Sequence, residues 1–362
     1  MAVSAPPRLL IPRWAVVILA LALAPLVWWY WPVAALPARF AESACHHLPL
    51  RDAETGAEIT GIEDIARLPD GRLVLSAYDR LDPAQPNGGL YLFTLDEALA
   101  NPPFLPRLRP ALPAKGLSGG LRPHGIAAHP ELPLVAVINR GRDGGVRLLL
   151  TTYEAREQRL RLSDEGAADS TLCAANDLAF QDLTLWITLD RGICGAETLS
   201  TLLGLEYTGL LLTMPLTSDD PGATPAVQRS QLFFPNGVAL IGTETLVAET
   251  RAGRILRPGE APAIPVSGGP DNLTRDLSDP EEPALIVALH PSLPRLGLYR
   301  FGWTERAPSR IARISLTDGG EEILFDDPSG RLFSGATVGV LSGGRLVAGS
   351  VRAPGLLICG GS

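Results

Sequence analysis

The sequence predicts an all-β protein, a six-bladed β-propeller preceded by an N-terminal hydrophobic helix. Three observations support this fold class. A unit made of a turn and a short apolar strand occurs six times, at spacings of roughly 40 to 60 residues, which is the period of propeller blades. The chain holds 37 Gly and 33 Pro, as suits many short strands joined by tight turns. No amphipathic helix of convincing length follows the N-terminal segment.

The repeated unit reads LPDGRLVLSA in its first copy, a turn followed by an apolar run. Alternating runs between the copies, such as GLYLFTL and RIARISL, are typical of outer strands. We therefore expect an N-terminal segment over residues 1–43 and one propeller over residues 44–362. The six copies occupy residues 68–77, 129–138, 180–189, 240–249, 279–289 and 341–350.

The N-terminal segment contains no charged residue from Trp14 to Ala38. That length is sufficient to span a bilayer, which needs about 20 apolar residues. Two arginines precede the run and four aromatic residues, WWYW, lie within its far half, where interfacial aromatics anchor. The pattern predicts a retained membrane anchor, with the propeller exported to the periplasmic or extracellular side. A cleaved signal peptide is the alternative.

The net charge of −8, without a stripe rich in Lys and Arg, argues against nucleic acid as a partner. Export permits disulfides. Four cysteines allow three connectivities. We expect Cys45 to pair with Cys359, because the two ends of a closed ring must meet, and Cys173 to pair with Cys194.

Polar clusters lie just before the turns, on the strand of each unit that would line the central channel. Because the innermost strands of a propeller converge on one axis, we expect these side chains to meet. Carboxylate and amide oxygens without cysteine favour Ca²⁺ over zinc or copper. Neighbours in an extended chain point to opposite sides, so adjacent ligands would serve two calcium ions at different depths. The clusters are Glu63-Asp64, His124, Asn176-Asp177, Asn236 and Asp271-Asn272, with Thr337 and no strong ligand in the sixth copy.

Together these residues resemble the paraoxonase/arylesterase family of calcium-dependent lactonases. The resemblance runs from about Cys45 to Cys359, includes the hydrophobic N-terminal helix, and rests on EDIARLPDG, PHGI, ND, NG and DN in this order. It implies a base at His124 and an active-site wall that includes His290. It also implies two metal sites: a catalytic calcium held by Glu63, Asn176, Asn236, Asp271 and Asn272, and a structural calcium held by Asp64, Asp177 and the backbone carbonyl of Ile126.

One position departs from the family pattern. The family pairs its proposed base with a second histidine on the next strand, where this sequence has Arg140. An arginine stays protonated and cannot relay a proton, and its charge would lower the pKa of His124. Arg140 would instead face an acidic group of the substrate, or lie at the surface.

The resemblance implies hydrolysis of small lactones and aryl esters, with calcium polarising the carbonyl and a water activated by His124 or Glu63. A gluconolactonase-like sugar lactonase is an alternative, although the paired acids Asp64 and Asp177 argue against a single metal. A membrane-tethered binding propeller with purely structural calcium is another. The run GLSGG (116–120) matches a nucleophile-elbow pattern but lacks the preceding strand and following helix that such an elbow needs.

Overall fold

A computed structural model describes most of the chain after the N-terminal segment: residues 33–81, 88–100, 106–192, 194, 206–216, 225–259, 261–279 and 281–360. The predicted hydrophobic helix falls largely on residues outside this set. None of the described helices combines the length and the apolarity that a membrane crossing requires. Residues 35–362 form one compact unit.

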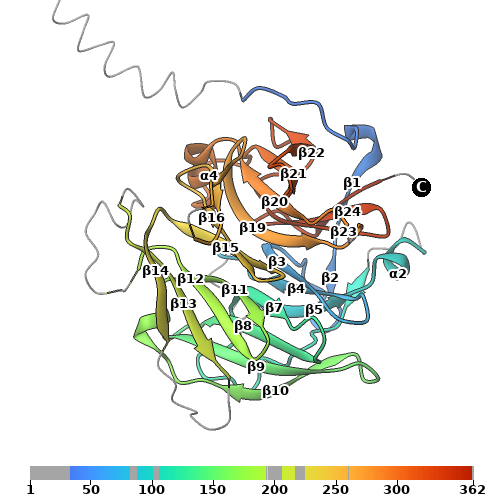
Figure 1. The fold of residues 1–362 in the computed structure, drawn as a ribbon. Coiled ribbons are helices and arrows are strands. Elements are labelled where there is room, and N and C mark those ends of the chain that lie inside the picture. The colour runs from blue at the N-terminus through green and yellow to red at the C-terminus, as the bar shows by residue number, and fades with distance from the viewer. Residues whose placement is uncertain are drawn as a thin grey trace, which may run out of the picture. The chain divides into compact units, whose positions relative to one another are not determined.

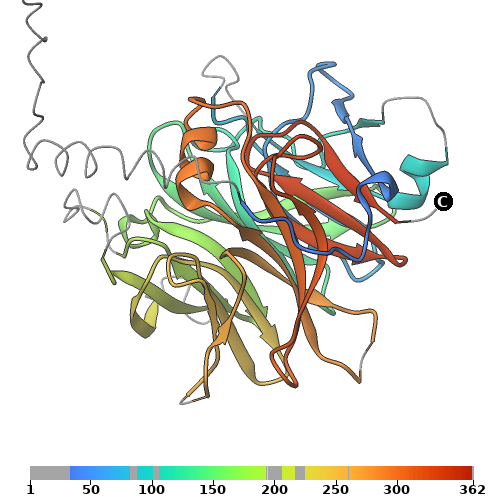
Figure 2. The same cartoon turned by 90° about the horizontal axis from the view of Figure 1, so that it is seen from above.

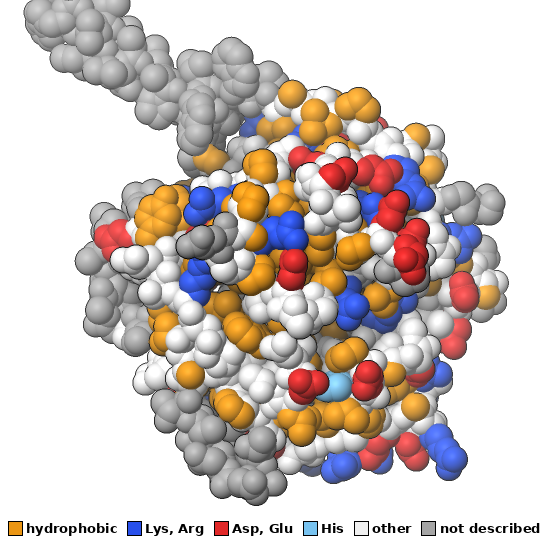
Figure 3. All heavy atoms as spheres, viewed as in Figure 1, with side chains coloured by type: hydrophobic (Ala, Val, Ile, Leu, Met, Phe, Trp, Pro, Cys, Tyr) orange, Lys and Arg blue, Asp and Glu red, His pale blue; other side chains and the backbone are white. Residues whose placement is uncertain are grey.

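Six small sheets surround one axis, and four-stranded antiparallel sheets make up all but the first (Figure 1). The inner strands pack on one another in chain order, and the sixth returns to the first, so the ring is closed. The six-bladed propeller predicted from the repeats is therefore present. Figure 3 shows acidic, basic and apolar side chains interspersed over one face.

The first three blades follow the order of the chain. Blade 1 has β3 (Ile62–Arg67), β4 (Leu73–Ala77) and β5 (Gly89–Phe93). Blade 2 has β7 (Pro123–Ala128), β8 (Leu134–Arg140), β9 (Val146–Glu154) and β10 (Arg159–Glu165). Blade 3 has β11 (Ala175–Gln181), β12 (Thr184–Leu189), β13 (Gly209–Pro215) and β14 (Ala226–Leu232).

The last three blades continue around the axis, and the N-terminal strand completes the sixth. Blade 4 has β15 (Pro235–Ile241), β16 (Glu244–Glu249), β17 (Arg254–Leu256) and β18 (Ile264–Pro265). Blade 5 has β19 (Gly269–Asp276), β20 (Ala284–His290), β21 (Ser309–Ser315) and β22 (Glu321–Asp327). Blade 6 has β23 (Ala336–Ser342), β24 (Arg345–Ser350), β25 (Leu356–Cys359) and β1 (Cys45–Leu48).

Short elements lie between and beside the blades. They are the parallel pair β2 (Arg51–Asp52) and β6 (Arg107–Leu108), the 3₁₀ turns η1 (Glu42–Ala44) and η2 (Ser170–Leu172), and the helices α2 (Leu95–Leu99) and α4 (Leu293–Arg300). Each copy of the predicted turn unit joins the inner strand of a blade to its second strand. The runs expected to form outer strands are the third strands β5 and β21.

The ring closes through its two ends. β1 pairs antiparallel with β25, and Figures 1 and 2 show the blue N-terminal strand beside the red C-terminal strands. Cys45 and Cys359 face each other in this register and form a disulfide, and Cys173 and Cys194 form a second one. Both predicted pairings are confirmed. The compact unit begins at Ala35, earlier than the predicted boundary, because the extended segment before β1 bonds to β22 through backbone groups.

The apolar core lies between neighbouring blades. Between blades 1 and 6, for example, Ile62 and Leu75 pack with Val340 and Leu356, and all four are buried. Alternate residues of each strand supply one such layer on each side of the blade. This packing fixes the inner strands around the axis, and so fixes the polar residues that they carry.

Candidate functional site

A β-bulge interrupts every inner strand at the same point, where the predicted site residues lie. At a bulge the pairing ladder is broken and the side chains are re-aimed. The six register shifts fall between Ile62 and Asp64, Pro123 and Ile126, Ala175 and Leu178, Pro235 and Val238, Pro270 and Leu273, and Ala336 and Val338. All of the predicted channel residues therefore lie at bulges.

Glycines make these bulges compatible with closely packed blades. A Cβ on Gly125, which follows His124 in PHGI, would clash with the backbone of Asn176 in the next blade. A Cβ on Gly237, which follows Asn236 in FPNG, would clash with the backbone at Asp271. Only glycine permits such an approach, so the two motifs reflect blade packing as well as chemistry.

The bulges place most of the predicted ligands in one of two cavities, at opposite ends of the inner strands, whereas His124, Asn272 and Arg140 line neither cavity. A cavity of about 330 Å³ at their beginnings is lined by Glu63, Asn176, Asn236, Asp271 and His290. A cavity of about 520 Å³ at the other end is lined by Asp64 and Asp177 together with apolar residues. Neighbouring side chains thus face opposite ways, as their alternation along the strand predicts. We call the first cavity the upper cavity and the second the lower cavity.

Glu63 lies at the centre of a charged cluster beside the upper cavity. Its Oε2 is 2.6 Å from Nδ1 of His124, and it also forms an ion pair with Arg80. A guanidinium nitrogen of Arg80 lies 2.7 Å from the same imidazole nitrogen. All three side chains are largely buried. Glu63 and His124 were predicted to come together, whereas Arg80 was not predicted as part of the site.

Burial lowers the pKa of His124 well below its ordinary value, and the positive charges of Arg140, Arg80 and Arg300 lower it further. The imidazole is therefore neutral at neutral pH and has one ring nitrogen free to accept a proton. Its Nε2 is buried and makes no hydrogen bond within the described part of the chain. His124 thus has the charge state that a base requires.

Arg140 ends β8, and one of its guanidinium nitrogens donates a 2.7 Å hydrogen bond to the carbonyl oxygen of Ala175 on blade 3. Burial lowers the pKa of Arg140 to about 10, partly offset by the negative charge of Asp190. It remains a cation at neutral pH. Its charge lowers the pKa of His124, in the direction expected from the sequence.

Other polar residues at the bulges and beside them are also held by specific contacts. His290 Nε2 lies 2.6 Å from Oδ2 of Asp271, so the predicted wall histidine orients a predicted ligand. Asn272 donates a 2.9 Å hydrogen bond from Nδ2 to the carbonyl oxygen of Glu63. Thr337, on the inner strand without a strong ligand, donates to the same carbonyl oxygen. These contacts link blades 1, 5 and 6 around the axis.

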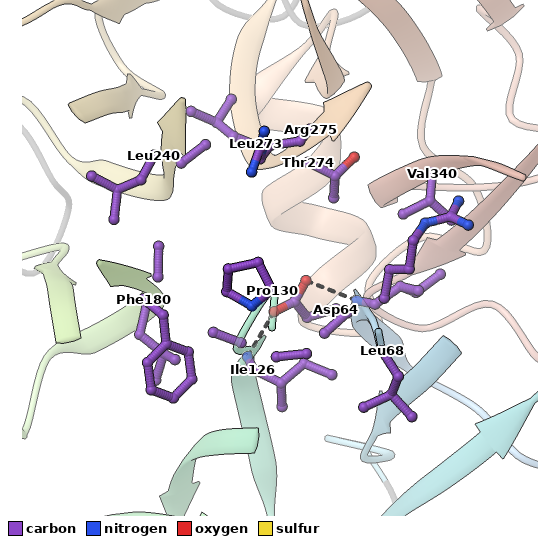
Figure 4. Close-up of a pocket in the computed structure, with 18 of the residues that line it drawn as sticks. Asp64, Leu68, Ile126, Pro130, Phe180, Leu240, Leu273, Thr274, Arg275 and Val340 are labelled. Atoms are coloured by element: carbon purple, nitrogen blue, oxygen red, sulfur yellow. Dashed lines mark hydrogen bonds between the residues drawn. The ribbon is translucent and has the colours of Figure 1, made fainter. Parts of the chain in front are cut away.

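Asp64 and Asp177 both line the lower cavity. Figure 4 shows Asp64 in this cavity, with a dashed hydrogen bond to Ile126. Each carboxylate accepts a backbone hydrogen bond from the next inner strand: Asp64 from the N–H of Ile126 and Asp177 from that of Val238. Burial raises the pKa of both, and the charge of Asp64 raises that of Asp177 further. The contact of Ile126 with Asp64 is through its N–H. The predicted use of its carbonyl by a metal stays a prediction.

The upper set has the chemistry of a site for a hard cation. Within the described residues, no three His, Cys, Asp or Glu side chains are arranged to hold a metal by themselves. A metal would therefore need the amide oxygens of the asparagines. Oδ1 of Asn236 is buried and accepts no hydrogen bond within the described part of the chain, which suits a metal ligand. The donors fit Ca²⁺, on the condition that Glu63 exchanges its contact with Arg80 for the ion.

A ring of basic residues surrounds the upper cavity, and only two of its members, Arg140 and His290, were expected from the sequence. In each blade, one residue of the second strand pairs with the inner-strand residue that directly precedes the bulge. A basic residue follows this second-strand residue by one to three positions. The signal is visible in AYDR, INR, LDR, ETR, LH and SVR, the ends of the six second strands. The ring comprises Arg80, Arg140, Arg191, Arg251, His290 and Arg352.

Comparisons with known proteins show the fold. No protein-family model and no curated protein sequence matches the chain. A gluconolactonase from Xanthomonas campestris aligns over 90% of this chain and 95% of its own, with 14% identity and a TM-score of 0.50. A putative glucose dehydrogenase from Thermus thermophilus aligns over 85% and 98%, with 18% identity and a TM-score of 0.44.

A third solved structure is the extracellular domain of a putative one-component system from Bacteroides thetaiotaomicron. It aligns over 88% of this chain, with 14% identity and a TM-score of 0.43, and this chain spans only 33% of its length. Sequence identities this low establish a shared fold and nothing finer. The chain is a six-bladed β-propeller with gluconolactonase- and glucose dehydrogenase-like structural neighbours, and membership of the paraoxonase/arylesterase family specifically is not shown.

Proposed function

We propose that this propeller is a calcium-dependent hydrolase of lactones and aryl esters, with its reaction centre in the upper cavity. The observation that carries the proposal is the convergence of oxygen donors and a neutral, buried histidine at the bulges of the inner strands. A fold alone does not decide a function, so the proposal depends on these side chains.

Five residues would hold the catalytic ion, and each comes from an inner strand: Glu63, Asn176, Asn236, Asp271 and Asn272. The chemistry that calcium supplies in such a site is stabilisation of negative charge developing on a carbonyl oxygen. The three amide donors add no charge, so the two carboxylates balance the ion without giving the site a net negative charge, which suits that role. Asp64 and Asp177 would hold the second, structural ion.

His124 is the proposed base. Nδ1 of His124 lies 2.6 Å from Oε2 of Glu63 and 2.7 Å from a guanidinium nitrogen of Arg80, which can only donate. If Arg80 gives up this contact, Nδ1–H is donated to Glu63 and the lone pair of the imidazole is on Nε2, which has no other partner among the described residues. Nε2 can then take a proton from a water that attacks the substrate carbonyl. The lowered pKa keeps His124 ready to accept this proton but makes it a weaker base. Glu63 is the alternative acceptor, because its carboxylate is adjacent.

Two other functions can be tested alongside this one. The solved gluconolactonase with the same fold makes a sugar lactone the second candidate substrate class. A binding propeller with structural calcium is the non-catalytic candidate. The two disulfides suit an oxidising compartment and support export of the propeller, whereas a membrane anchor over the N-terminal segment stays a proposal.

The test is hydrolysis by the full-length protein of a panel of aliphatic lactones, aryl esters and gluconolactone, with calcium and with excess EGTA. Turnover of aliphatic lactones or aryl esters that EGTA abolishes supports the proposal. Turnover restricted to gluconolactone favours the second candidate. If no substrate is hydrolysed although calorimetry detects calcium binding, the propeller is a binding module.

A further inference from the structure

The basic ring around the upper cavity is largely tethered to the protein itself. Arg80 pairs with Glu63, Arg191 lies 3.0 Å from Asp190, and His290 contacts Asp271. Arg140 donates to the carbonyl of Ala175. Arg352 donates to the carbonyl of Tyr299, and its guanidinium also stacks on the Tyr299 ring. These contacts fix the ring and satisfy much of its hydrogen-bonding capacity.

Arg300 is different. It is the last residue of α4, lines the upper cavity, and is only half-buried. Its side chain makes no hydrogen bond and no ion pair within the described part of the chain. Its positive charge nevertheless reaches His124, Arg80 and Arg140, since it affects the pKa of each. Among the described residues, Arg300 is thus a cation without a counter-ion, beside the proposed base.

The charge balance of the cavity favours an additional anion. Three carboxylates line it, Glu63, Asp190 and Asp271, and each already contacts a basic residue of the ring. Three arginines line it as well, Arg80 pairs with the lining residue Glu63, and the charge of Arg140 acts on His124. Positive charge is in excess before a metal binds, and a divalent cation would increase that excess. Such an arrangement attracts anions and concentrates them.

Buried guanidinium nitrogens without partners point the same way. Nη1 of Arg80 and Nε of Arg140 are both buried and make no hydrogen bond within the described residues. An unsatisfied charged donor is costly, so the groups of the protein around these two cations compensate them only in part. The planar guanidinium of Arg300 matches a carboxylate, which it can bind through two parallel hydrogen bonds.

We infer that the upper cavity selects substrates that carry a carboxylate, and that Arg300 is the residue that binds it. This inference rests on the proposed function and names its substrate class: small anionic lactones or esters. The volume of about 330 Å³ is at the small end for ligand sites, so the acid and the scissile carbonyl must belong to one compact molecule. Arg300 determines specificity and takes no part in the proton transfer.

The experiment compares two small lactones, γ-butyrolactone with a carboxylate on its γ carbon (the saturated carbon next to the ring oxygen) and the same ring with a carboxamide on that carbon. They differ in charge and hardly in shape. For the wild-type protein in calcium, at fixed ionic strength, we expect kcat/KM to be at least about tenfold higher for the carboxylate. Arg300→Gln should remove that preference, mainly through KM for the anion. Arg306→Gln is the matched control, because Arg306 is exposed and does not line the cavity.

A binding measurement separates this inference from the proposed function. The open-chain product of the anionic lactone, 2-hydroxyglutarate, is titrated calorimetrically into the wild-type protein and the Arg300→Gln variant. Loss of binding in the variant supports the anion site even if neither lactone is hydrolysed, a result that would overturn only the proposed function. If both lactones are hydrolysed equally well and both proteins bind the product equally, the anion site is overturned. The proposed hydrolase function would be unaffected by that result. Equal or tighter binding of inorganic phosphate would overturn the assignment to a carboxylate.

Discussion

The carboxylate of Asp177 on β11 accepts a 2.9 Å hydrogen bond from the backbone N–H of Val238 on β15. Asp64 on β3 makes the equivalent 2.7 Å contact with Ile126 on β7. Two buried acids therefore join neighbouring blades at the axis, where burial opposes their ionisation. A cation between them would stabilise their charged forms and the contacts between blades together.

Calcium is accordingly expected to stabilise the propeller. A ligand that binds only the folded state at about 100 times its Kd adds about 2.7 kcal/mol, so Tm should rise by several degrees in calcium and fall in EGTA. Scanning calorimetry of the wild-type protein and of Asp177→Asn measures the effect. The variant should lose most of the calcium-dependent increase. An unchanged Tm on chelation would exclude a stabilising ion at this position.

Substitution of His124 and of Asn236 should separate base catalysis from metal binding. His124→Ala is expected to lower kcat by about two to four orders of magnitude, because it removes the proton acceptor, while calorimetric calcium affinity stays nearly intact. Asn236→Ala should weaken calcium binding, because it removes an oxygen donor. His46→Ala, at an exposed position of β1, is the control. If His124→Ala retains most of the activity, Glu63 becomes the preferred acceptor.

Arg80 is expected to compete with calcium for Glu63, with which it forms an ion pair. Arg80→Gln removes a positive charge next to the proposed ligand. At an effective dielectric constant near 20, that change should raise calcium affinity by about tenfold or more. Calorimetric titration of calcium into both proteins measures it. Weaker binding by the variant would show that Arg80 instead holds Glu63 in place for the ion.

The ion pair between Arg313 and Asp276 should contribute to the acid stability of blade 5. Burial alone would raise the pKa of Asp276, but hydrogen bonds from Ser278 and Arg313 outweigh it and leave the pKa lowered. Because the pKa of Asp276 is lower in the folded than in the unfolded protein, its ionised form stabilises the fold at pH values above the unfolded-state pKa near 3.8. This stabilisation is lost as the pH falls through the folded-state pKa.

We therefore expect Asp276→Asn to reduce the free energy of unfolding by about 3 kcal/mol at pH 7, because a largely buried pair loses one partner. The difference from wild type should shrink below about pH 4. Urea titrations at pH 7 and about pH 3.5 measure both values. Glu154→Gln is the control, since its partners Arg159 and Arg161 are mostly exposed and the cost should stay below about 1 kcal/mol. A difference independent of pH would contradict an electrostatic origin.

The two disulfides should differ in their effect on stability. The Cys45–Cys359 bond joins residues separated by 314 positions, and the loop-closure model gives it about 5 kcal/mol. The Cys173–Cys194 bond, with a separation of 21, should contribute about 3 kcal/mol. Denaturant unfolding of the two double Cys→Ser variants measures these losses. The opposite ranking would indicate that strain or residual structure, and not loop length, dominates.

Much of the architecture was predictable because the repeated turn shows where the inner strand of each blade ends and the second strand begins. Once Pro69-Asp70-Gly71 is identified as the turn after an inner strand, the equivalent turns locate the other five inner strands and the polar residues on them. The ring topology likewise predicted the pairing of Cys45 with Cys359. These features depend on a short local pattern that every blade repeats.

Arg140 and His290 were expected at the site, but the ring as a whole and Arg300 were not predicted, for two physical reasons. The basic residue follows the second-strand residue that pairs just before the bulge by one to three positions, depending on the blade. Arg80 and Arg140 therefore do not align when the blades are compared in sequence. Arg300 ends α4, an eight-residue helix that begins with Pro294 at its first turn and carries no strong amphipathic pattern. Its approach to His124 depends on how that helix packs over the ring, which the local sequence does not encode.

The pairing of β1 with β25 also determines the order in which this protein is able to mature. β1 is the first strand of the propeller to be synthesised, and its partner is the last. An emerging chain therefore carries Cys45 as an unpaired thiol on an unpaired strand until residue 359 is complete. Earlier blades can form as they emerge, but the sixth blade cannot. A chain truncated by even a few residues at its end would remain open at this seam, with a free strand edge exposed to other chains.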